Sequence, residues 1–357
     1  MSSHTESMDQ ARVDFERALK RTEAAMAYAK RPLAPMVGQT PKDVVWTKNK
    51  AKLYRYHAKG DRKHATPILF VYALINRPYI LDLAPGNSMV EFLVEQGYDV
   101  FLLDWGTPGE EDAGLKFDDY VLDYIPRAVK QVLKHSGAKD FSLIGYCMGG
   151  TMATMYAALH PEAPLRNLVL MATPVDFSEA GLFSAWLDPK HYDVDRVVDA
   201  YKLVPADFIE FGSKLLKPIQ NYMSPYATLM DRLDDEQFVQ GWLVMNHWIN
   251  DGIPFAGEAF RQWIKDLYQQ NKLIKGEMRL GGRKVDLSNI RCSVLSVVAN
   301  LDHIVQVCQS TPLLAHISSE DAEQLAIKAG HVGLVAGRSA KQKFFPGLNA
   351  WLSARSN

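Results

Sequence analysis

Six short segments that are almost wholly apolar constrain the fold of this chain more than any other feature. They are ILFVYAL (68–74), DVFLLDW (99–105), FSLIG (141–145), NLVLMAT (167–173), SVLSVVA (293–299) and QLAIKA (324–329). Segments of helical composition, 87–97 and 118–137, separate the early ones, and a hairpin is expected before them at 43–57. The second helical segment is expected to start at the cap residue Asp118, to kink at Pro126 and to end at Gly137. Parallel strands covered on both faces have this apolar character. The pattern predicts an α/β fold with a mainly parallel sheet and helices on both faces.

The sharpest local signal is the stretch FSLIGYCMGGT, in which a predicted strand runs through Gly-x-Cys-x-Gly into a predicted helix. Such a tight turn leaves no room for side chains at Gly145 and Gly149, and it exposes Cys147 at a helix N-terminus. Backbone N–H groups and the helix dipole there favour a thiolate. A buried structural cysteine is the alternative, which the strand–turn–helix context disfavours. Cys147 is therefore the predicted nucleophile of an α/β-hydrolase fold, in which serine is the usual residue at this position.

A nucleophile of this kind needs a general base and a carboxylate that orients the base. In this fold the chain order is nucleophile, acid, histidine. His331, in KAGHVG after the last predicted strand, is the expected base, and His303 is its main competitor. The Gly-x-Cys-x-Gly turn around Cys147 is called the elbow below. Asp302, at the end of a strand, is favoured as the acid over Asp176, which follows the strand after the elbow.

Two backbone N–H groups are expected to stabilise a developing oxyanion. Met148, directly after the nucleophile, supplies one, and Ile75, in the loop after segment 68–74, is the candidate for the second. The sequence contains no metal-ligating cluster and no phosphate-binding glycine motif. No metal or cofactor is therefore expected.

The strand–helix alternation stops between about residues 178 and 287, a stretch that we call the cap segment. It holds four of the seven tryptophans: Trp186, Trp242, Trp248 and Trp263. We interpret it as a helical cap over the sheet's C-terminal edge, with additional core helices as the alternative. The expected organisation is an N-terminal helical segment (1–40), a core (41–177 and 288–357) and the cap segment. Within the first of these, a helix over 8–30 carries a thin apolar stripe of Phe15, Leu19 and Met26 and is expected to pack on the body, with packing on a partner as the alternative.

Charge and cysteine content exclude several classes of protein. The 40 basic and 41 acidic residues give a net charge of −1, which argues against binding to nucleic acid or to anionic membranes. Three dispersed cysteines form neither a disulfide framework nor a zinc pattern. The sequence shows no secretory signal and no apolar run long enough to span a membrane. A cytoplasmic protein is expected.

Motifs along nearly the whole chain resemble the catalytic subunit of poly(3-hydroxyalkanoate) synthases: YALINRPYILDL, VFLLDWGTP, GYCMGGT, TPVDFS, FRQWIKDLYQQNKL, LDHIV and AGHVG. The length is similar to the short, two-subunit types, closest to class IV with class III as the alternative. The resemblance implies a small accessory subunit (PhaR-type, or PhaE-type), a location at polymer granules, and a homodimer as a further arrangement.

The resemblance also implies the reaction and the roles of the site residues. An (R)-3-hydroxyacyl-CoA, of which short-chain 3-hydroxybutyryl-CoA is the favoured candidate, would be polymerised with release of CoA. Cys147 would carry the growing chain, His331 would activate it, Asp302 would complete the site by orienting His331 or by acting on the 3-hydroxyl, and His303 would line the site. A thiol suits this chemistry because exchange between two thioesters keeps the acyl group reactive. The alternatives are a cysteine-dependent hydrolase, such as a dienelactone-hydrolase-like enzyme or a thioesterase, and a non-catalytic granule protein.

Overall fold

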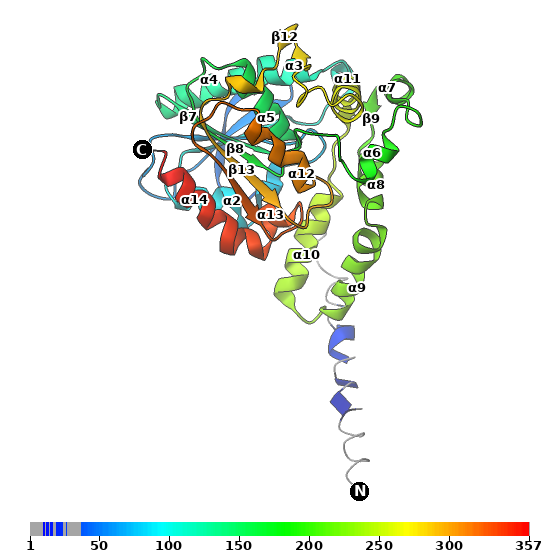
Figure 1. Cartoon of the computed structure of the whole chain (residues 1–357). Helices are drawn as coiled ribbons and strands as arrows, with labels where there is room; N and C mark the ends of the chain where they lie inside the picture. The colour runs from blue at the N-terminus through cyan, green and yellow to red at the C-terminus, as the bar shows by residue number, and fades with distance from the viewer. Residues whose placement is uncertain are drawn as a thin grey trace.

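An eight-stranded sheet forms the centre of the computed structural model (Figure 1), which describes residues 37–356 and, before them, residues 10, 12–13, 15–16, 19–23 and 26. Its strand order is β1-β2-β6-β3-β7-β8-β13-β14. The bounds are β1 Lys42–Lys48, β2 Ala51–Tyr56, β6 Val100–Asp104, β3 Ile68–Val71, β7 Phe141–Tyr146, β8 Leu165–Met171, β13 Ser293–Ala299 and β14 Ala322–Ile327. Each of the seven predicted strand regions therefore contains a strand.

The pairing of the strands matches the predicted α/β-hydrolase fold. β1 and β2 form the expected hairpin, β2 runs antiparallel to β6, and all later neighbours are parallel. β7, which carries the elbow at its end, lies between β3 and β8. All six of its residues are buried. The predicted nucleophile thus follows a strand in the interior of the sheet, and the fold prediction is confirmed.

Helices cover both faces of the sheet (Figure 1). α2 (Met89–Glu95) and α14 (Phe345–Ser353) pack together on one face. α4 (Ile125–Ser136) and α5 (Met148–Leu159) lie on the other, and all twelve residues of α5 are buried. A helix that is apolar all round is typical of the protein interior. α5 therefore anchors the elbow in the core.

Three π-helical turns precede prolines: η3 (Tyr120–Tyr124), η4 (Ile219–Met223) and η8 (Ala340–Phe344) end two residues before Pro126, Pro225 and Pro346. Proline lacks an N–H group, and its ring clashes with the carbonyl of the residue four positions earlier. The turn before each proline widens accordingly. The kink predicted at Pro126 takes this form, between α3 (Phe117–Asp119) and α4.

The predicted start of the helical region 118–137 was wrong by one to two residues. Its first turn begins at Phe117, and the backbone N–H of Lys116 donates to Asp119 at 2.8 Å. The Asp118 carboxylate instead accepts hydrogen bonds from residues distant in sequence, including Gln262 at 2.9 Å. Tertiary contacts therefore decide the role of this aspartate. The end at Gly137, which has φ = 70°, agrees with the prediction.

The cap segment contains mainly short helices, drawn in green to yellow beside the sheet in Figure 1. They are α6 (Leu182–Trp186), α7 (Val194–Tyr201), α8 (Ala206–Leu215), η4, α9 (Ser224–Asp231), α10 (Glu236–Ile249), α11 (Gly257–Gln262) and η5 (Trp263–Gln269). Two short strand pairs complete it, β9 (Leu203–Val204) with β10 (Phe255–Ala256) and β11 (Arg279–Leu280) with β12 (Arg283–Lys284). The turn at Gly281 and Gly282 joins β11 to β12.

Several short elements connect the larger ones. They are η1 (Pro78–Leu81), β4 (Asp82–Ala84), β5 (Asn87–Ser88), η2 (Glu110–Asp112), η6 (Leu287–Asn289), α12 (Val307–Ser310), η7 (Thr311–Ala315) and α13 (Gly333–Ala336). α12 and α13 follow the loops that carry Asp302 and His331, respectively.

Residues before 37 are only partly described. Those described between 10 and 26 are helical, in line with part of the predicted helix 8–30, whose other positions lie outside the described residues. Phe15, Leu19 and Met26 are 69%, 51% and 62% exposed. The expectation that this apolar stripe packs on the body is therefore wrong for these three side chains.

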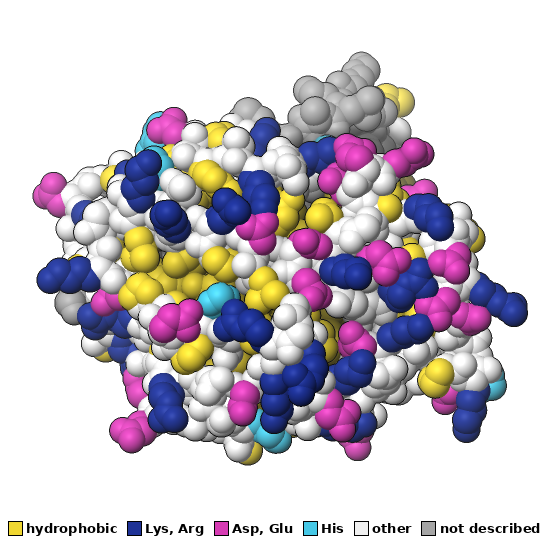
Figure 2. Space-filling model, turned by 90° about the horizontal axis from the view of Figure 1, so that it is seen from above, with side chains coloured by type: hydrophobic (Ala, Val, Ile, Leu, Met, Phe, Trp, Pro, Cys, Tyr) yellow, Lys and Arg dark blue, Asp and Glu magenta, His cyan; other side chains and the backbone are white. Residues whose placement is uncertain are grey.

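The surface carries charges of both signs. Figure 2, seen from above the view of Figure 1, shows lysines and arginines interspersed with aspartates and glutamates around apolar patches. This distribution suits the net charge of −1. Within the described part of the chain, no helix has the length and apolar character that a membrane span requires.

Candidate active site

Cys147 occupies the tip of a strained turn. It has φ = 55° and ψ = −127°, a backbone conformation that a non-glycine residue rarely adopts, and it directly precedes the first residue of α5. Its carbonyl accepts hydrogen bonds from the N–H groups of Gly150 and Thr151 at 2.9 and 3.3 Å, and its own N–H donates to Met171 at 2.9 Å. The thiol is partly exposed. Strain of this kind persists only where the surroundings enforce it.

Three glycines make the turn possible. A Cβ atom at Gly145 would lie 2.4 Å from the Cα of Gly150, and one at Gly149 would lie 2.2 Å from the carbonyl oxygen of Val71. At Gly150 it would lie 1.8 Å from Oγ1 of Thr173. The sequence predicted that Gly145 and Gly149 leave no room for a side chain, and it made no such prediction for Gly150. Close approach of α5 to β3 and β7 therefore requires glycine on both sides of Cys147.

His331 and Asp302 form a buried pair. His331 Nδ1 lies 2.6 Å from Asp302 Oδ2, and the Asp302 side chain is fully shielded from solvent. The other carboxylate oxygen, Oδ1, accepts the N–H groups of Ile304 and Val305 at 2.8 and 2.9 Å. Both oxygens are thus engaged, and the imidazole is held with Nδ1 toward the acid, which leaves Nε2 free to act on a partner.

Electrostatics favour a protonated imidazole. Burial lowers the pKa of His331, but the Asp302 carboxylate and the Cys147 sulfur, through their charges and side-chain hydrogen bonds, raise it to about 10. Both Cys147 and His331 line one cavity. The three residues that the chain order predicted to act together are therefore neighbours in space. When Asp302 and Cys147 are both ionised, the His331 ring is protonated on both nitrogens and positively charged at neutral pH.

Asp176, the alternative acid, has a different environment. Its Oδ1 accepts hydrogen bonds from the N–H and hydroxyl of Ser178 at 2.9 and 2.7 Å and from Asn271 at 2.8 Å. Burial raises the pKa of Asp176, but these hydrogen bonds outweigh it and lower that pKa below its ordinary value. The carboxylate closes a local turn and ties it to the end of η5, so it has the structural role of a turn residue.

His303 lines the cavity that contains Cys147 and His331. Its ring is half-buried, and burial together with the nearby charges of Lys217 and His331 lowers the pKa of His303. This imidazole is neutral near pH 7. It can therefore donate or accept a hydrogen bond at the cavity wall without adding charge.

Met148 and Ile75, the expected oxyanion donors, both lie beside Cys147. Met148 is the first residue of α5, and both side chains line an apolar cavity together with Cys147. The carbonyl of Ile75 accepts the N–H of Ile253 at 3.1 Å, which fixes this loop against the cap segment. Their role as oxyanion donors stays a prediction.

Two cavities meet at Cys147. One, of about 340 Å³, is lined mainly by aromatic and aliphatic side chains, among them Phe183, Trp186, Phe260 and Trp263. The other, of about 420 Å³, contains His303 and His331 together with amide and charged side chains of the cap segment such as Asn221 and Lys214. Cys147 thus borders a mainly apolar cavity on one side and a more polar cavity on the other.

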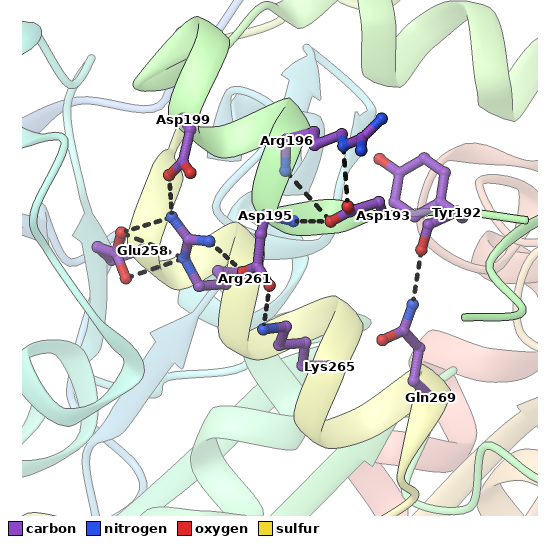
Figure 3. Close-up of polar contacts among 9 residues, drawn as sticks. All are labelled: Tyr192, Asp193, Asp195, Arg196, Asp199, Glu258, Arg261, Lys265 and Gln269. Atoms are coloured by element: carbon purple, nitrogen blue, oxygen red, sulfur yellow. Dashed lines mark hydrogen bonds and ion pairs between the residues drawn. The ribbon is translucent and has the colours of Figure 1, made fainter. Parts of the chain in front are cut away.

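A polar cluster joins helices of the cap segment to one another (Figure 3). Arg261 on α11 contacts Asp195 on α7 and donates to Asp199 and Glu258 at 2.9 and 3.2 Å. The next residue, Gln262, accepts the N–H of Phe117 in the core at 2.7 Å. α11 therefore contacts both α7 and the core.

The same helical stretch also holds the loop before α7 (Figure 3). Gln269 donates to the carbonyls of Leu187 and Tyr192 at 3.0 and 3.2 Å. Leu187 and Tyr192 line the apolar cavity. The side chains of η5 therefore fix part of the wall near Cys147.

Two tyrosines near the pair were not singled out from the sequence as site residues. Tyr146, the residue before Cys147, stacks on the His331 ring with a centroid distance of 5.1 Å. Tyr268 lines the apolar cavity, and burial followed by the charge of Cys147 raises its pKa. The position of Tyr146 next to Cys147 in the elbow motif was the only sign in the sequence that it could belong to the site. Its contact with His331, 185 positions away, could not be predicted.

Comparison with known proteins identifies the family. Residues 66–337 match the family model for the alpha/beta hydrolase fold, and residues 7–93 match that of the poly-beta-hydroxybutyrate polymerase (PhaC) N-terminus. The chain is 41% identical over 360 residues to the poly(3-hydroxyalkanoate) polymerase subunit PhaC of Haloferax mediterranei, an alignment that covers 100% of this chain and 73% of that protein. The chain belongs to the poly(3-hydroxyalkanoate) polymerase family. It is an acyltransferase-type enzyme of that family.

A second relative in the polymerase family matches over most of both proteins. The PhaC subunit of Allochromatium vinosum is 40% identical over 321 residues, which covers 89% of this chain and 90% of that subunit. Among solved structures, a monoacylglycerol lipase of Paleococcus ferrophilus superposes with a TM-score of 0.52 at 16% identity, covering 85% of this chain and 99% of the lipase. At that identity the lipase supports the fold and says nothing of the reaction.

Proposed function

We propose that this polymerase joins (R)-3-hydroxyacyl units from their CoA thioesters through a covalent thioester on Cys147. The observation that carries the proposal is the partly exposed thiol on a positive-φ turn, beside a histidine that a buried carboxylate holds in place. Membership in the polymerase family supports the overall reaction. The family model for poly-beta-hydroxybutyrate polymerases supports a short-chain monomer such as 3-hydroxybutyryl-CoA.

In the first step, the Cys147 sulfur attacks the thioester carbonyl of the substrate. The new C–S bond forms as the C–S bond to CoA breaks, and the departing CoA thiolate takes the proton from His331. One thioester replaces another, so the acyl group keeps its reactivity. Met148 and Ile75 are the proposed donors to the developing oxyanion.

Chain growth requires a hydroxyl to attack the acyl group on sulfur. The 3-hydroxyl oxygen of one unit attacks the thioester carbonyl of another, His331 accepts the hydroxyl proton, and an ester bond forms while the C–S bond breaks. Because both Asp302 oxygens are engaged and the side chain is shielded from solvent, we assign Asp302 to the orientation of His331. Direct contact of Asp302 with the 3-hydroxyl would require this arrangement to open.

Water must be kept from the acyl group, because hydrolysis would end growth. The aromatic lining of the cavity beside Cys147 supports this requirement, with Trp263 and Phe260 buried there. We assign the apolar cavity to the acyl chain and the cap segment to the exclusion of water. The cap segment must then move to admit the substrate.

The proposed partners follow from the family resemblance. They are a small accessory subunit of the PhaR or PhaE type, the polymer granule surface and a second copy of the chain. Large apolar side chains on η4 and α9 support an apolar partner, because Ile219, Met223 and Tyr226 are 63%, 68% and 53% exposed.

The test is a product analysis with (R)-3-hydroxybutyryl-CoA, with and without an accessory subunit. Polymer together with free CoA is the expected result. Free 3-hydroxybutyrate with CoA would instead favour a hydrolase, and the absence of CoA release under both conditions would favour a non-catalytic granule protein. The Cys147→Ala variant, which keeps the size of the turn residue small, should release no CoA.

A further inference from the structure

The residue before the nucleophile makes two separate contacts with the proposed base. The Tyr146 hydroxyl donates a hydrogen bond to the main-chain carbonyl of His331 at 3.1 Å. The Tyr146 ring stacks on the imidazole, with an angle of 26° between the ring planes. These residues lie 185 positions apart in the chain. One side chain therefore fixes both the backbone and the ring of His331.

Tyr146 is itself held firmly in place. Its side chain is 2% exposed, it ends the interior strand β7, and its ring packs against Tyr72 at a centroid distance of 5.6 Å. Burial raises the pKa of Tyr146 well above its ordinary value, so the hydroxyl stays protonated and remains a donor. The loop that carries His331 has the N–H of Leu334 as a second donor to the same carbonyl, at 3.2 Å.

We propose that Tyr146 is a positioning residue that holds the His331 imidazole in reach of the adjacent Cys147 sulfur. Consecutive residues on one rigid strand end then present the nucleophile and position its base. The distance between the Cys147 sulfur and the His331 imidazole is then set by Tyr146 as well as by the loop between β14 and α13. This inference rests on the proposed roles of Cys147 and His331, because Tyr146 acts only through His331.

Two variants separate the contributions of the hydroxyl and the ring. Tyr146→Phe keeps the stacked ring and removes the donor, and we expect kcat to fall about threefold to tenfold with KM unchanged, the range of one net hydrogen bond. Tyr146→Leu removes both contacts and should lower kcat further. Tyr156→Phe is the matched control, because Tyr156 is also buried and its ring contacts that of a histidine, His160, with the centroids 4.8 Å apart. It should retain wild-type kcat.

The deciding readout is alkylation of Cys147 by iodoacetamide as a function of pH, followed by mass spectrometry of the peptide that contains Cys147. A poorly placed imidazolium stabilises the thiolate less, so the midpoint should move upward by about 0.5–1 pH unit in Tyr146→Phe, the equivalent of a threefold to tenfold change. The shift should be larger in Tyr146→Leu. Peptide analysis separates Cys147 from Cys292 and Cys308, which are also free thiols.

Alkylation needs no substrate, so it tests the positioning role even if the polymerase assay fails. A wild-type midpoint in both Tyr146 variants would overturn the proposal, whatever their kcat. A shift as large in Tyr156→Phe would also overturn it, because the effect would then be a general consequence of losing a buried hydroxyl. Far-UV circular dichroism identifies a variant that does not fold, and the near-isosteric Phe variant then decides alone.

Discussion

Asp302 holds the His331 imidazole in one orientation: one carboxylate oxygen lies 2.6 Å from Nδ1, and two backbone N–H groups donate to the other oxygen. The pair is buried, so the carboxylate has little access to other partners. This arrangement fixes the direction of the imidazole. It makes the account of the site testable through Asp302 as well as through Cys147.

Replacing Asp302 by Asn should lower the rate of polymer formation by about 10²–10⁴-fold, the usual contribution of an oriented general base. Asp176→Asn is the matched control, because that carboxylate contacts Ser178 and Asn271. Its activity should stay within a few fold of wild type. Initial rates of CoA release measure both variants, and a reversal of the two effects would exchange the assignments of the acids.

The protonation of His331 should persist to high pH. Its pKa is raised to about 10 by Asp302 and Cys147 against the effect of burial, so the ring should keep its proton from pH 6 to 9 and lose it as the pH rises through about 10. Removing the carboxylate in Asp302→Asn should move this transition to lower pH. The NMR shift of the His331 ring proton on Cε1 follows the titration directly, and a midpoint near 6.5 in the wild type would contradict the ion pair.

Much of the core follows from the sequence because strands buried on both faces are apolar without interruption. β6, β7, β8 and β13 agree with their predicted segments to within two residues at each end. The elbow could also be predicted from the sequence, because its glycines are required by contacts with neighbouring backbone such as that of Val71. Chain order then led to Asp302 and His331, which the structure brings together. Their catalytic roles stay predictions.

Features that depend on distant contacts could not be predicted. Asp118 was expected to cap a helix, yet its carboxylate accepts from Gln262, 144 residues away. The stacking of Tyr146 on His331 has no periodic signal in the sequence. The ion pairs of Arg261 with Asp195 and Asp199 on α7 also join residues more than 60 positions apart, which local propensity does not specify.

Gly149→Ala should destabilise the fold, because the added Cβ would lie 2.2 Å from the carbonyl oxygen of Val71. We expect a loss of about 1–3 kcal/mol or more in the free energy of unfolding, together with a displacement of Cys147. Gly241→Ala in α10 has no atom within 4 Å of the new methyl group and should be neutral or stabilising by about 0.5–1 kcal/mol. Urea unfolding measures both changes, and equal stabilities would contradict the packing argument.

Arg261→Met should loosen α7, because it removes the cation shared by Asp195, Asp199 and Glu258. Amide hydrogen exchange in residues 194–201 should accelerate about fivefold, which corresponds to ~1 kcal/mol of local stability. Arg196→Met is the control, because the Arg196 side chain is 88% exposed and pairs with Asp193 at the start of the same helix. Such an exposed pair contributes little. Equal exchange in the two variants would show that the Arg261 cluster does not hold the helix.

Mass spectrometry of the peptide that contains Cys147, after a brief reaction with (R)-3-hydroxybutyryl-CoA and an acid quench, tests the central claim most directly. We predict one or more 3-hydroxybutyryl units on that peptide, released by neutral hydroxylamine as expected of a thioester, and no adduct at position 147 in Cys147→Ala. Polymer formation by Cys147→Ala, or polymer from the wild type with the acyl groups always on another residue, would contradict the account.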